Sequence, residues 1–430
     1  MMTAIIFAVL FLFIMMGFPI AICMGLTAVI FFAVLGQMDV LLMLPARMYS
    51  GTTSFTLLAI PFFILAGNLM NTGGMTQRLV RFAQCLIGHI RGGLGQVTVV
   101  TNMIMAGMSG SAVADATGTG IILIPAMERA GYPRAFSAAV VGAASTIGPI
   151  IPPSIPFVIF GSITGTSVGR LFLGGFLPGV LMGVLLMITV AILAKRRGYP
   201  REQRASLREL LVAALQATPA WGAPIIIIGG ILAGIFTPTE AAVAASIYAF
   251  VLGMLVYREI KAADLPRILW ETIENTVQVM FIISAASIFG FLLIRQQVPT
   301  TIVEALMSLT STPWVVLLII NVILLILGCF MESIAVMLLT IPVLMPLITR
   351  VGIDPVHFGV VMTLNLMIGL LTPPVGMCLY AVSAIGKVPL WQLAKELWPY
   401  IVALIVCLLL ITYIPVLVVW IPNLVMGVGR

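Results

Sequence analysis

The chain has 430 residues, of which 61% are hydrophobic and only 8% are charged. This composition excludes the soluble classes of protein and indicates a polytopic membrane protein. The net charge of +7 would suggest a nucleic-acid partner in a soluble domain, but in a membrane protein the position of the basic residues sets the topology. We therefore expect membrane lipid, and no nucleic acid, around this chain.

Apolar segments fill almost the whole sequence, beginning with a charge-free stretch from Met1 to Gly36 that Pro19 divides. This stretch has no basic n-region and no small-residue cleavage site, so we interpret it as membrane-embedded chain. The expected crossings are 3–17, 20–36, 52–72, 135–166, 171–194, 219–236, 239–256, 273–293, 356–386 and 398–420.

Basic residues set the orientation of these ten crossings. With the N-terminus outside, every one of the 21 Lys and Arg residues falls on the inner side except Arg47, Arg170, Arg295, Arg350 and Arg430. Because cytoplasmic loops are enriched in Lys and Arg, this orientation is favoured over its mirror image, and both termini are expected outside. The basic, amphipathic segments 75–91 and 258–270 are expected to lie along the cytoplasmic interface.

Two short polar stretches interrupt the apolar sequence, at Gly107–Asp115 and at Gly328–Ser333. The flanking segments, 94–108 with 116–130 and 313–327 with 334–349, are each about 15 residues long and would reach only ~22 Å as helices. That length is short of a hydrocarbon core of ~30 Å. Each pair therefore predicts a re-entrant hairpin with a Gly/Ser tip.

An internal repeat becomes visible when the sequence is shifted by 221 positions. Gly107 then falls on Gly328, Arg129 on Arg350, and the pair Pro152–Pro153 on Pro373–Pro374. With five crossings in each copy, an odd number, the second copy must be inverted relative to the first. Inverted repeats are typical of secondary transporters, whose ion and substrate sites lie near the midplane on discontinuous helices.

A span broken near its middle follows each hairpin, at Ser145–Ser154 and at Asn365–Gly376. Clustered prolines cannot continue a helix, so the backbone must unwind there. Unwound carbonyl groups suit a hard cation such as Na+, and the free N–H groups of the following half-helix attract an anion. We expect two related cation sites where the hairpin tips face the breaks, with an anionic substrate between them.

The residues expected to bind substrate are polar side chains at the tips and at the first break: Ser111, Asp115, Ser154, Glu332 and Ser333. Carboxylates inside apolar sequence are functional candidates by default, although Asp115 and Glu332 could also cap the second half-helix of each hairpin. Small residues at the tips could also serve only close helix packing. Glu240, just after Pro238, is interpreted as a first-turn helix acid.

Enzyme functions find little support in the motifs. Gly107-Met108-Ser109-Gly110 fits the short pattern of intramembrane serine proteases, but neither His89 nor His357 is placed to activate Ser109. The sequence contains no His-Glu-x-x-His zinc motif and no P-loop. The five cysteines are interpreted as buried apolar residues without disulfides or a metal. We therefore expect a carrier that is driven by an ion gradient, with no cofactor.

Several long motifs resemble the large membrane subunit of tripartite ATP-independent periplasmic (TRAP) transporters, the dicarboxylate-permease M type. They are LLAIPFFILAGNLMNTGG at 57–74, GGLGQVTVVTNMIMAGMSGSAVADA at 92–116, GPIIPPSIPFVIFG at 148–161, GIFTPTEAAVAA at 234–245, TIPVLMPL at 340–347 and GLLTPPVGMCLY at 369–380. The resemblance spans nearly the whole chain. The second tip departs from it, with Cys329, Met331 and Glu332 where relatives often carry small residues or an aspartate.

This resemblance implies an elevator-type carrier of the bacterial inner membrane that imports a small organic acid with Na+. It also implies two partners, a small four-span membrane subunit and a periplasmic substrate-binding protein. At matched positions it assigns Ser109, Ser145 and Gly148 to one sodium ion, and Gly328, Gly369 and Thr372 to the other. The alternative is a stand-alone sodium/dicarboxylate or arsenite-type carrier of the same inverted-repeat plan.

The expected division of the chain follows from the repeat and the resemblance. It comprises scaffold and arm helices of the first repeat (1–91), the first transport-domain half (92–166), a scaffold span (167–194), a cytoplasmic connector (195–218), scaffold and arm helices of the second repeat (219–297), the second transport-domain half (298–386) and a C-terminal scaffold span (387–430).

Overall fold

A computed structural model describes residues 2–201, 203–310 and 312–427, so Arg430 lies outside the described residues. Within these ranges the chain is almost entirely helical and forms no strand. Eight helices are long and apolar enough to cross a membrane, and they include both helices of the second hairpin. The remaining predicted crossings correspond to shorter helices or to broken ones. The chain is therefore an all-α, polytopic membrane protein, as predicted.

The first repeat runs from the N-terminus to the end of a 30-residue helix, α10. Its elements are α1 (Met2–Met15), α2 (Ile20–Val34), α3 (Met38–Thr52), η1 (Phe55–Leu58), α4 (Ala59–Thr72), α5 (Met75–Ile87), α6 (Gly93–Ser109), α7 (Ala112–Arg129), α8 (Arg134–Ser145), α9 (Ile155–Thr164) and α10 (Val168–Arg197). The hairpin helices α6 and α7 have 17 and 18 residues, somewhat longer than expected.

The second repeat follows the same order after α11 (Leu207–Ala217) and η2 (Thr218–Trp221). Its elements are α12 (Gly222–Leu232), α13 (Pro238–Val251), η3 (Leu252–Val256), η4 (Ala262–Asp264), α14 (Leu265–Arg295), α15 (Val298–Leu309), α16 (Pro313–Phe330), α17 (Ser333–Val351), α18 (Pro355–Gly369), α19 (Met377–Gly386), α20 (Leu390–Tyr413) and α21 (Val416–Met426). Adding 221 to the bounds of α6 gives 314–330, which matches α16, and the other hairpin and broken-span helices match equally well.

The two repeats differ most at α14, a single helix of 31 residues. Its counterpart in the first repeat is divided into α3 and α4. Pro61 lies in the first turn of α4. A proline is tolerated there, at the start of a helix, but in the interior of a continuous helix it would disrupt the hydrogen bonding. Ile282 occupies the corresponding position in α14, and the helix continues through it. The segment 258–270, expected to lie along the interface, comprises a short connector, the turn η4 and the first turns of α14.

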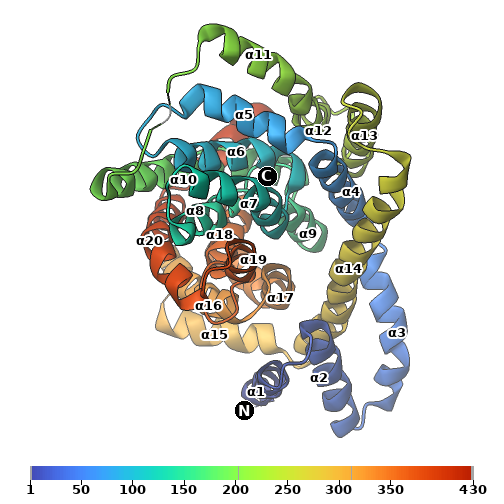
Figure 1. Ribbon diagram of the computed structural model, residues 1–430. Coiled ribbons are helices and arrows are strands. Elements are labelled where there is room, and N and C mark those ends of the chain that lie inside the picture. Colours follow the sequence, from blue (N-terminus) through green and yellow to red (C-terminus); the bar gives the residue numbers. More distant parts are fainter. Residues whose placement is uncertain (1, 202, 311, 428–430) are drawn as a thin grey trace.

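Contacts between the repeats follow an approximate two-fold relation. Helix α4 packs on α13, and the equivalent pair α14 and α2 packs in the same way. Likewise α7 contacts α19, and α17 contacts α9. Figure 1 shows the hairpins and broken spans gathered in one core, with α2, α3, α4, α13 and α14 forming a wall beside it. Helices α10 and α20 pack on core helices, α10 on α6 and α20 on α8 and α18.

Helices α5 and α15 lie on opposite sides of the core and lead into the two hairpins (Figure 1). Each is tied to the other repeat near its start. Arg78 of α5 forms an ion pair with Glu259 at 3.2 Å and lies over the ring of Tyr257 at 3.9 Å. At the equivalent place before α15, the Nε of Arg295 donates a 2.8 Å hydrogen bond to Gln37. The arm of the first repeat is thus held by an ion pair, and that of the second by a neutral acceptor.

Candidate cation and substrate site

The first hairpin turns at Gly110, which has a φ of +62° and joins α6 to α7. Glycine is required here because the positive φ disfavours other residues and because a side chain would not fit: a Cβ would lie 2.8 Å from the carbonyl oxygen of Pro153. Ser111 caps α7, its hydroxyl accepting a hydrogen bond from the N–H of Ala114. The structure therefore brings the first tip against the first broken span, as the sequence predicts.

Asp115 lies one turn into α7 and is completely buried. Its carboxylate points at the broken span, since a Cβ on Gly148 would collide with Oδ2 of Asp115. The Ser109 side chain lies close to the carboxyl group, yet neither carboxylate oxygen makes a hydrogen bond of normal geometry within the described part of the chain. A buried carboxylate without a partner beside unwound backbone is a favourable place for a cation.

The first break runs from Thr146 to Ser154 and includes a cis peptide between Pro152 and Pro153. The hydroxyl groups of the serines at its two ends donate to nearby carbonyl groups. Ser145, the last residue of α8, donates to Gly142 at 2.8 Å, and Ser154 donates to Pro149 at 2.5 Å. Because each hydroxyl uses its proton internally, its oxygen presents lone pairs to whatever lies beside it. Ser154 also caps α9 by accepting from the N–H of Phe157.

The second tip contacts the second break through bare backbone. A Cβ added to Gly369 would lie 2.7 Å from the Cα, C and O atoms of Gly328, so only glycine permits this approach. The N–H of Val375 donates to the carbonyl of Cys329 at 3.0 Å. Thr372 donates to the carbonyl of Gly369 at 2.9 Å, and its hydroxyl lies 3.0 Å from the thiol of Cys329.

The two tips differ in charge at equivalent positions. Glu332, which corresponds to Ser111, caps α17 by accepting from the N–H of Ala335 at 3.1 Å, and the hydroxyl of Ser333 donates to its other oxygen. Val336 corresponds to Asp115 and brings no charge. The first tip therefore holds an unpartnered carboxylate beside its break, whereas the carboxylate of the second tip is already engaged by helix N–H groups.

Burial also separates the two halves of the site. All residues of the first break are buried, while Pro373, Pro374 and Val375 of the second break are exposed. Helices α12 and α4 cover the first tip directly, since a Cβ on Gly107 would lie 2.9 Å from Pro224 of α12 and one on Gly67 of α4 would lie 3.5 Å from Ser109. In this structure the second break is the accessible one.

The structure brings the residues predicted for each cation to one place in each half. Ser109, Ser145 and Gly148 gather around the first tip, and Gly328, Gly369 and Thr372 around the second. Asp115, expected to bind substrate, lies against Gly148 and so belongs geometrically to the first of these clusters. Ser111, Ser154, Glu332 and Ser333, also expected to bind substrate, lie at the starts of half-helices, where the first three cap α7, α9 and α17.

Three contributors to the site have only weak signals in the sequence. They are Cys329 beside Thr372, Gly67 beneath Ser109, and Cys378 of α19, whose thiol lies within hydrogen-bonding reach of Ser145 in the other repeat. A cysteine or glycine in an apolar helix is too common to be noticed. No histidine approaches Ser109 among the described residues: the Nε2 of His357 lies 2.8 Å from the carbonyl of Ile411, and His89 precedes the far end of α6.

Comparison with known proteins identifies the chain. The family model described as "Tripartite ATP-independent periplasmic transporter, DctM component" matches residues 7–417. The chain belongs to the DctM family of TRAP transporter large permeases. This large permease is 42% identical to the sialic acid TRAP transporter large permease of Vibrio cholerae, covering 89% of this chain and 90% of the relative. It is 41% identical to the C4-dicarboxylate large permease of Pseudomonas aeruginosa, covering 88% and 89%.

Some relatives are longer than this large permease. The isethionate TRAP transporter permease of Oleidesulfovibrio alaskensis is 40% identical over 94% of this chain, which spans 64% of that relative. Solved structures share the fold at low identity. The Alcanivorax borkumensis YdaH transporter has a TM-score of 0.61 at 15% identity, covering 90% of this chain and 89% of its own. Neisseria gonorrhoeae MtrF has a TM-score of 0.63 at 13% identity, covering 91% and 85%.

Proposed function

We propose that this large permease imports a small organic acid together with Na+ across the bacterial inner membrane, with both of its termini in the periplasm. In this proposal a periplasmic binding protein delivers the acid, and a small four-span membrane subunit completes the complex. The relatives named above carry sialic acid, C4-dicarboxylates or isethionate according to their names, and all three are organic anions. The alternative of a stand-alone carrier is not favoured for a member of this family.

The observation that carries the sodium proposal is the buried carboxylate of Asp115 facing Gly148. An ionised carboxylate without a partner in a low-dielectric interior costs many kcal/mol, so a cation bound there would gain strongly. The neighbouring ligands are oxygen atoms of hydroxyl groups and unwound backbone, which suit a hard ion such as Na+. The equivalent site at Gly328, Gly369 and Thr372 would hold a second ion with neutral ligands.

The anionic substrate would bind between the two tips, where half-helices begin. Helix α19 begins after Gly376 without a side-chain cap, and α7 is capped only by the neutral Ser111. Their N–H groups and the positive ends of their dipoles favour a carboxylate. The exposed second break supplies a route to this region.

Movement of the core as one body past the wall would carry the bound solute across the membrane. The core comprises the two hairpins and broken spans. Helices α10 and α20 fall in spans expected from the sequence to be scaffold, but their contacts with α6, α8 and α18 favour their moving with the core. Helices α5 and α15, tied to the opposite repeat at Arg78 and Arg295, would remain attached to the wall at their starts. This is an elevator arrangement with two arms.

Uptake by proteoliposomes containing both membrane subunits tests the proposal. With the cognate binding protein and its solute outside, we expect accumulation only under an inward Na+ gradient. Omission of the small subunit or of the binding protein should abolish it. Undiminished uptake after complete replacement of Na+ by K+ would contradict sodium coupling, while leaving the family assignment intact.

A further inference from the structure

A chain of buried polar side chains joins the second hairpin to the second broken span. The Nδ2 of Asn365 in α18 donates to both the backbone carbonyl and the side-chain Oδ1 of Asn321 in α16, each at 2.9 Å. The Nδ2 of Asn321 in turn donates to the hydroxyl of Thr412 in α20 at 3.0 Å. All three side chains are buried. Polar side chains buried between membrane helices bond those helices to one another.

These contacts lie on the seam that also carries the second candidate cation site. Asn365 precedes Gly369 by four residues, about one helical turn, and Asn321 precedes Gly328 by seven residues, about two turns. Residues at these spacings share one face of a helix. The face of α16 that bonds to Asn365 is therefore the face that presents Gly328 to Gly369, where the two backbones are in contact.

A further contact holds the broken span on its other side. The Nε2 of His357 in α18 lies 2.8 Å from the carbonyl oxygen of Ile411 in α20, the residue before Thr412. Helices α16, α18 and α20 are thus joined to one another in three pairs, each pair through a buried polar side chain.

The first repeat carries apolar residues where the second has its two asparagines. Val100 and Ala144 occupy the positions that correspond to Asn321 and Asn365. The asparagine pair also has a cost, because Oδ1 of Asn365 is buried and has no hydrogen-bond partner among the described residues. Two apolar side chains would pack these helices without that cost. The pair is therefore better explained by the need for a fixed geometry than by packing alone.

We propose that Asn321 and Asn365 are positioning residues for the second cation site and hold the tip of the second hairpin against the second break. This inference rests on the proposed sodium coupling. In that proposal the site at Gly328 and Gly369 has only neutral ligands, so its affinity depends on where the backbone atoms are held. The first site attracts its cation through the charge of Asp115 and depends less on such a pair.

Substitution by the residues of the first repeat tests this role. Asn321→Val and Asn365→Ala remove the contact and introduce the side chains that α6 and α8 carry at the equivalent positions. In proteoliposomes with both membrane subunits and the cognate binding protein, each variant should raise the Na+ concentration for half-maximal uptake by about 3- to 15-fold. This is the range found for hydrogen bonds between membrane helices. The double variant should resemble the more strongly affected single variant, because the two residues act as a unit.

Hydrogen exchange tests the positioning itself, whichever ion drives uptake. The N–H of Val375 donates to the carbonyl of Cys329 at 3.0 Å, across the contact between the tip and the break. In the purified complex, both asparagine variants should speed exchange in peptides that contain Val375 by a similar factor. Peptides of the first break, 146–154, should be unchanged. A general loss of stability would instead speed exchange at both breaks.

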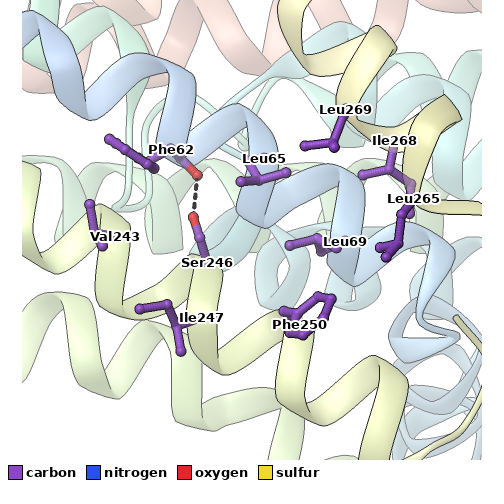
Figure 2. A pocket seen from close by; sticks show the side chains of 10 residues that line it. All are labelled: Phe62, Leu65, Leu69, Val243, Ser246, Ile247, Phe250, Leu265, Ile268 and Leu269. Carbon is purple, nitrogen blue, oxygen red and sulfur yellow. Dashed lines mark hydrogen bonds between the residues drawn. The ribbon is translucent and has the colours of Figure 1, made fainter. Parts of the chain in front are cut away.

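Two control variants lose a hydrogen bond elsewhere. Thr363 lies in α18 and is completely buried, but its hydroxyl donates within its own helix, to the carbonyl of Gly359 at 2.8 Å. Ser246 lies beside an apolar recess of about 310 Å³ and joins α13 to the carbonyl of Phe62 in α4 at 2.7 Å (Figure 2). Thr363→Val and Ser246→Ala should leave both the Na+ dependence and the exchange at the second break unchanged.

Unchanged exchange at the second break in folded asparagine variants would overturn the proposal. An equal change with Thr363→Val would also overturn it, as would a double variant in which the two effects on Na+ dependence multiply. Faster exchange at the second break with an unaltered Na+ dependence would show that the pair does not serve a cation site. Wild-type uptake that needs no Na+ would contradict the proposed function instead, and the exchange experiment would still decide whether the pair holds the tip.

Discussion

Replacing Gly369 by alanine tests the close approach at the second tip. The added Cβ would lie 2.7 Å from three backbone atoms of Gly328, a distance that real Cβ atoms do not show, so the tip and the break must separate. Overpacking of this kind costs about 1–3 kcal/mol. If the cost falls on the form that binds Na+, the Na+ concentration for half-maximal uptake rises by about 5- to 150-fold, since 1.4 kcal/mol is tenfold.

Two other glycines provide a graded comparison for this experiment. A Cβ on Gly328 would lie 3.3 Å from the Cα of Gly369, so Gly328→Ala should raise the half-maximal Na+ concentration less. A Cβ on Gly25, within α2, would meet nothing within 4 Å, and Gly25→Ala should change nothing. The order of the three effects is measured as uptake by proteoliposomes over a range of Na+ concentrations. Thermal unfolding verifies that each variant is folded. A folded Gly369→Ala protein with unchanged Na+ dependence, or a larger effect at Gly328, would refute the reasoning.

Two further predictions concern single charges. Asp115→Asn keeps the shape of the side chain but removes its charge. Because loss of one partner of a buried ionic contact costs about 3–5 kcal/mol, the affinity for Na+ measured by titration should fall by more than about 100-fold. Unchanged Na+ affinity would exclude Asp115 as a ligand. Arg78→Glu places like charges beside Glu259 and should slow uptake, and Glu259→Arg in the same chain should restore most of it. Reversing the ion pair of Glu271 with Arg267, inside one helix, should leave uptake unchanged.

Local chemistry explains what the sequence could predict. Prolines and glycines act on their own stretch of backbone, so the two breaks, the two tips and the 221-residue repeat are all visible in the order of the amino acids. Burial, by contrast, depends on which helices meet. The sequence therefore places Asp115 among residues for the substrate, while the packing of α7 on the first break turns its carboxylate toward Gly148.

Elements without strong periodicity are harder to predict. The continuity of α14 depends on Ile282 occupying the position that corresponds to Pro61, a difference that is clear only once the helices are aligned. Helix α15 occupies the first 12 residues of the range expected for the second transport half, ahead of the predicted hairpin. The role of Gly67 depends on a contact with Ser109, more than 40 positions away.

At 1.5 Å per residue, the 31 residues of α14 form a rod about 46 Å long. The connector holding one arm precedes its first residue, and Arg295, beside the other arm, is its last. One continuous helix therefore fixes the distance between the places where the two arms are attached. In the proposed movement both arms would pivot about points whose separation does not change.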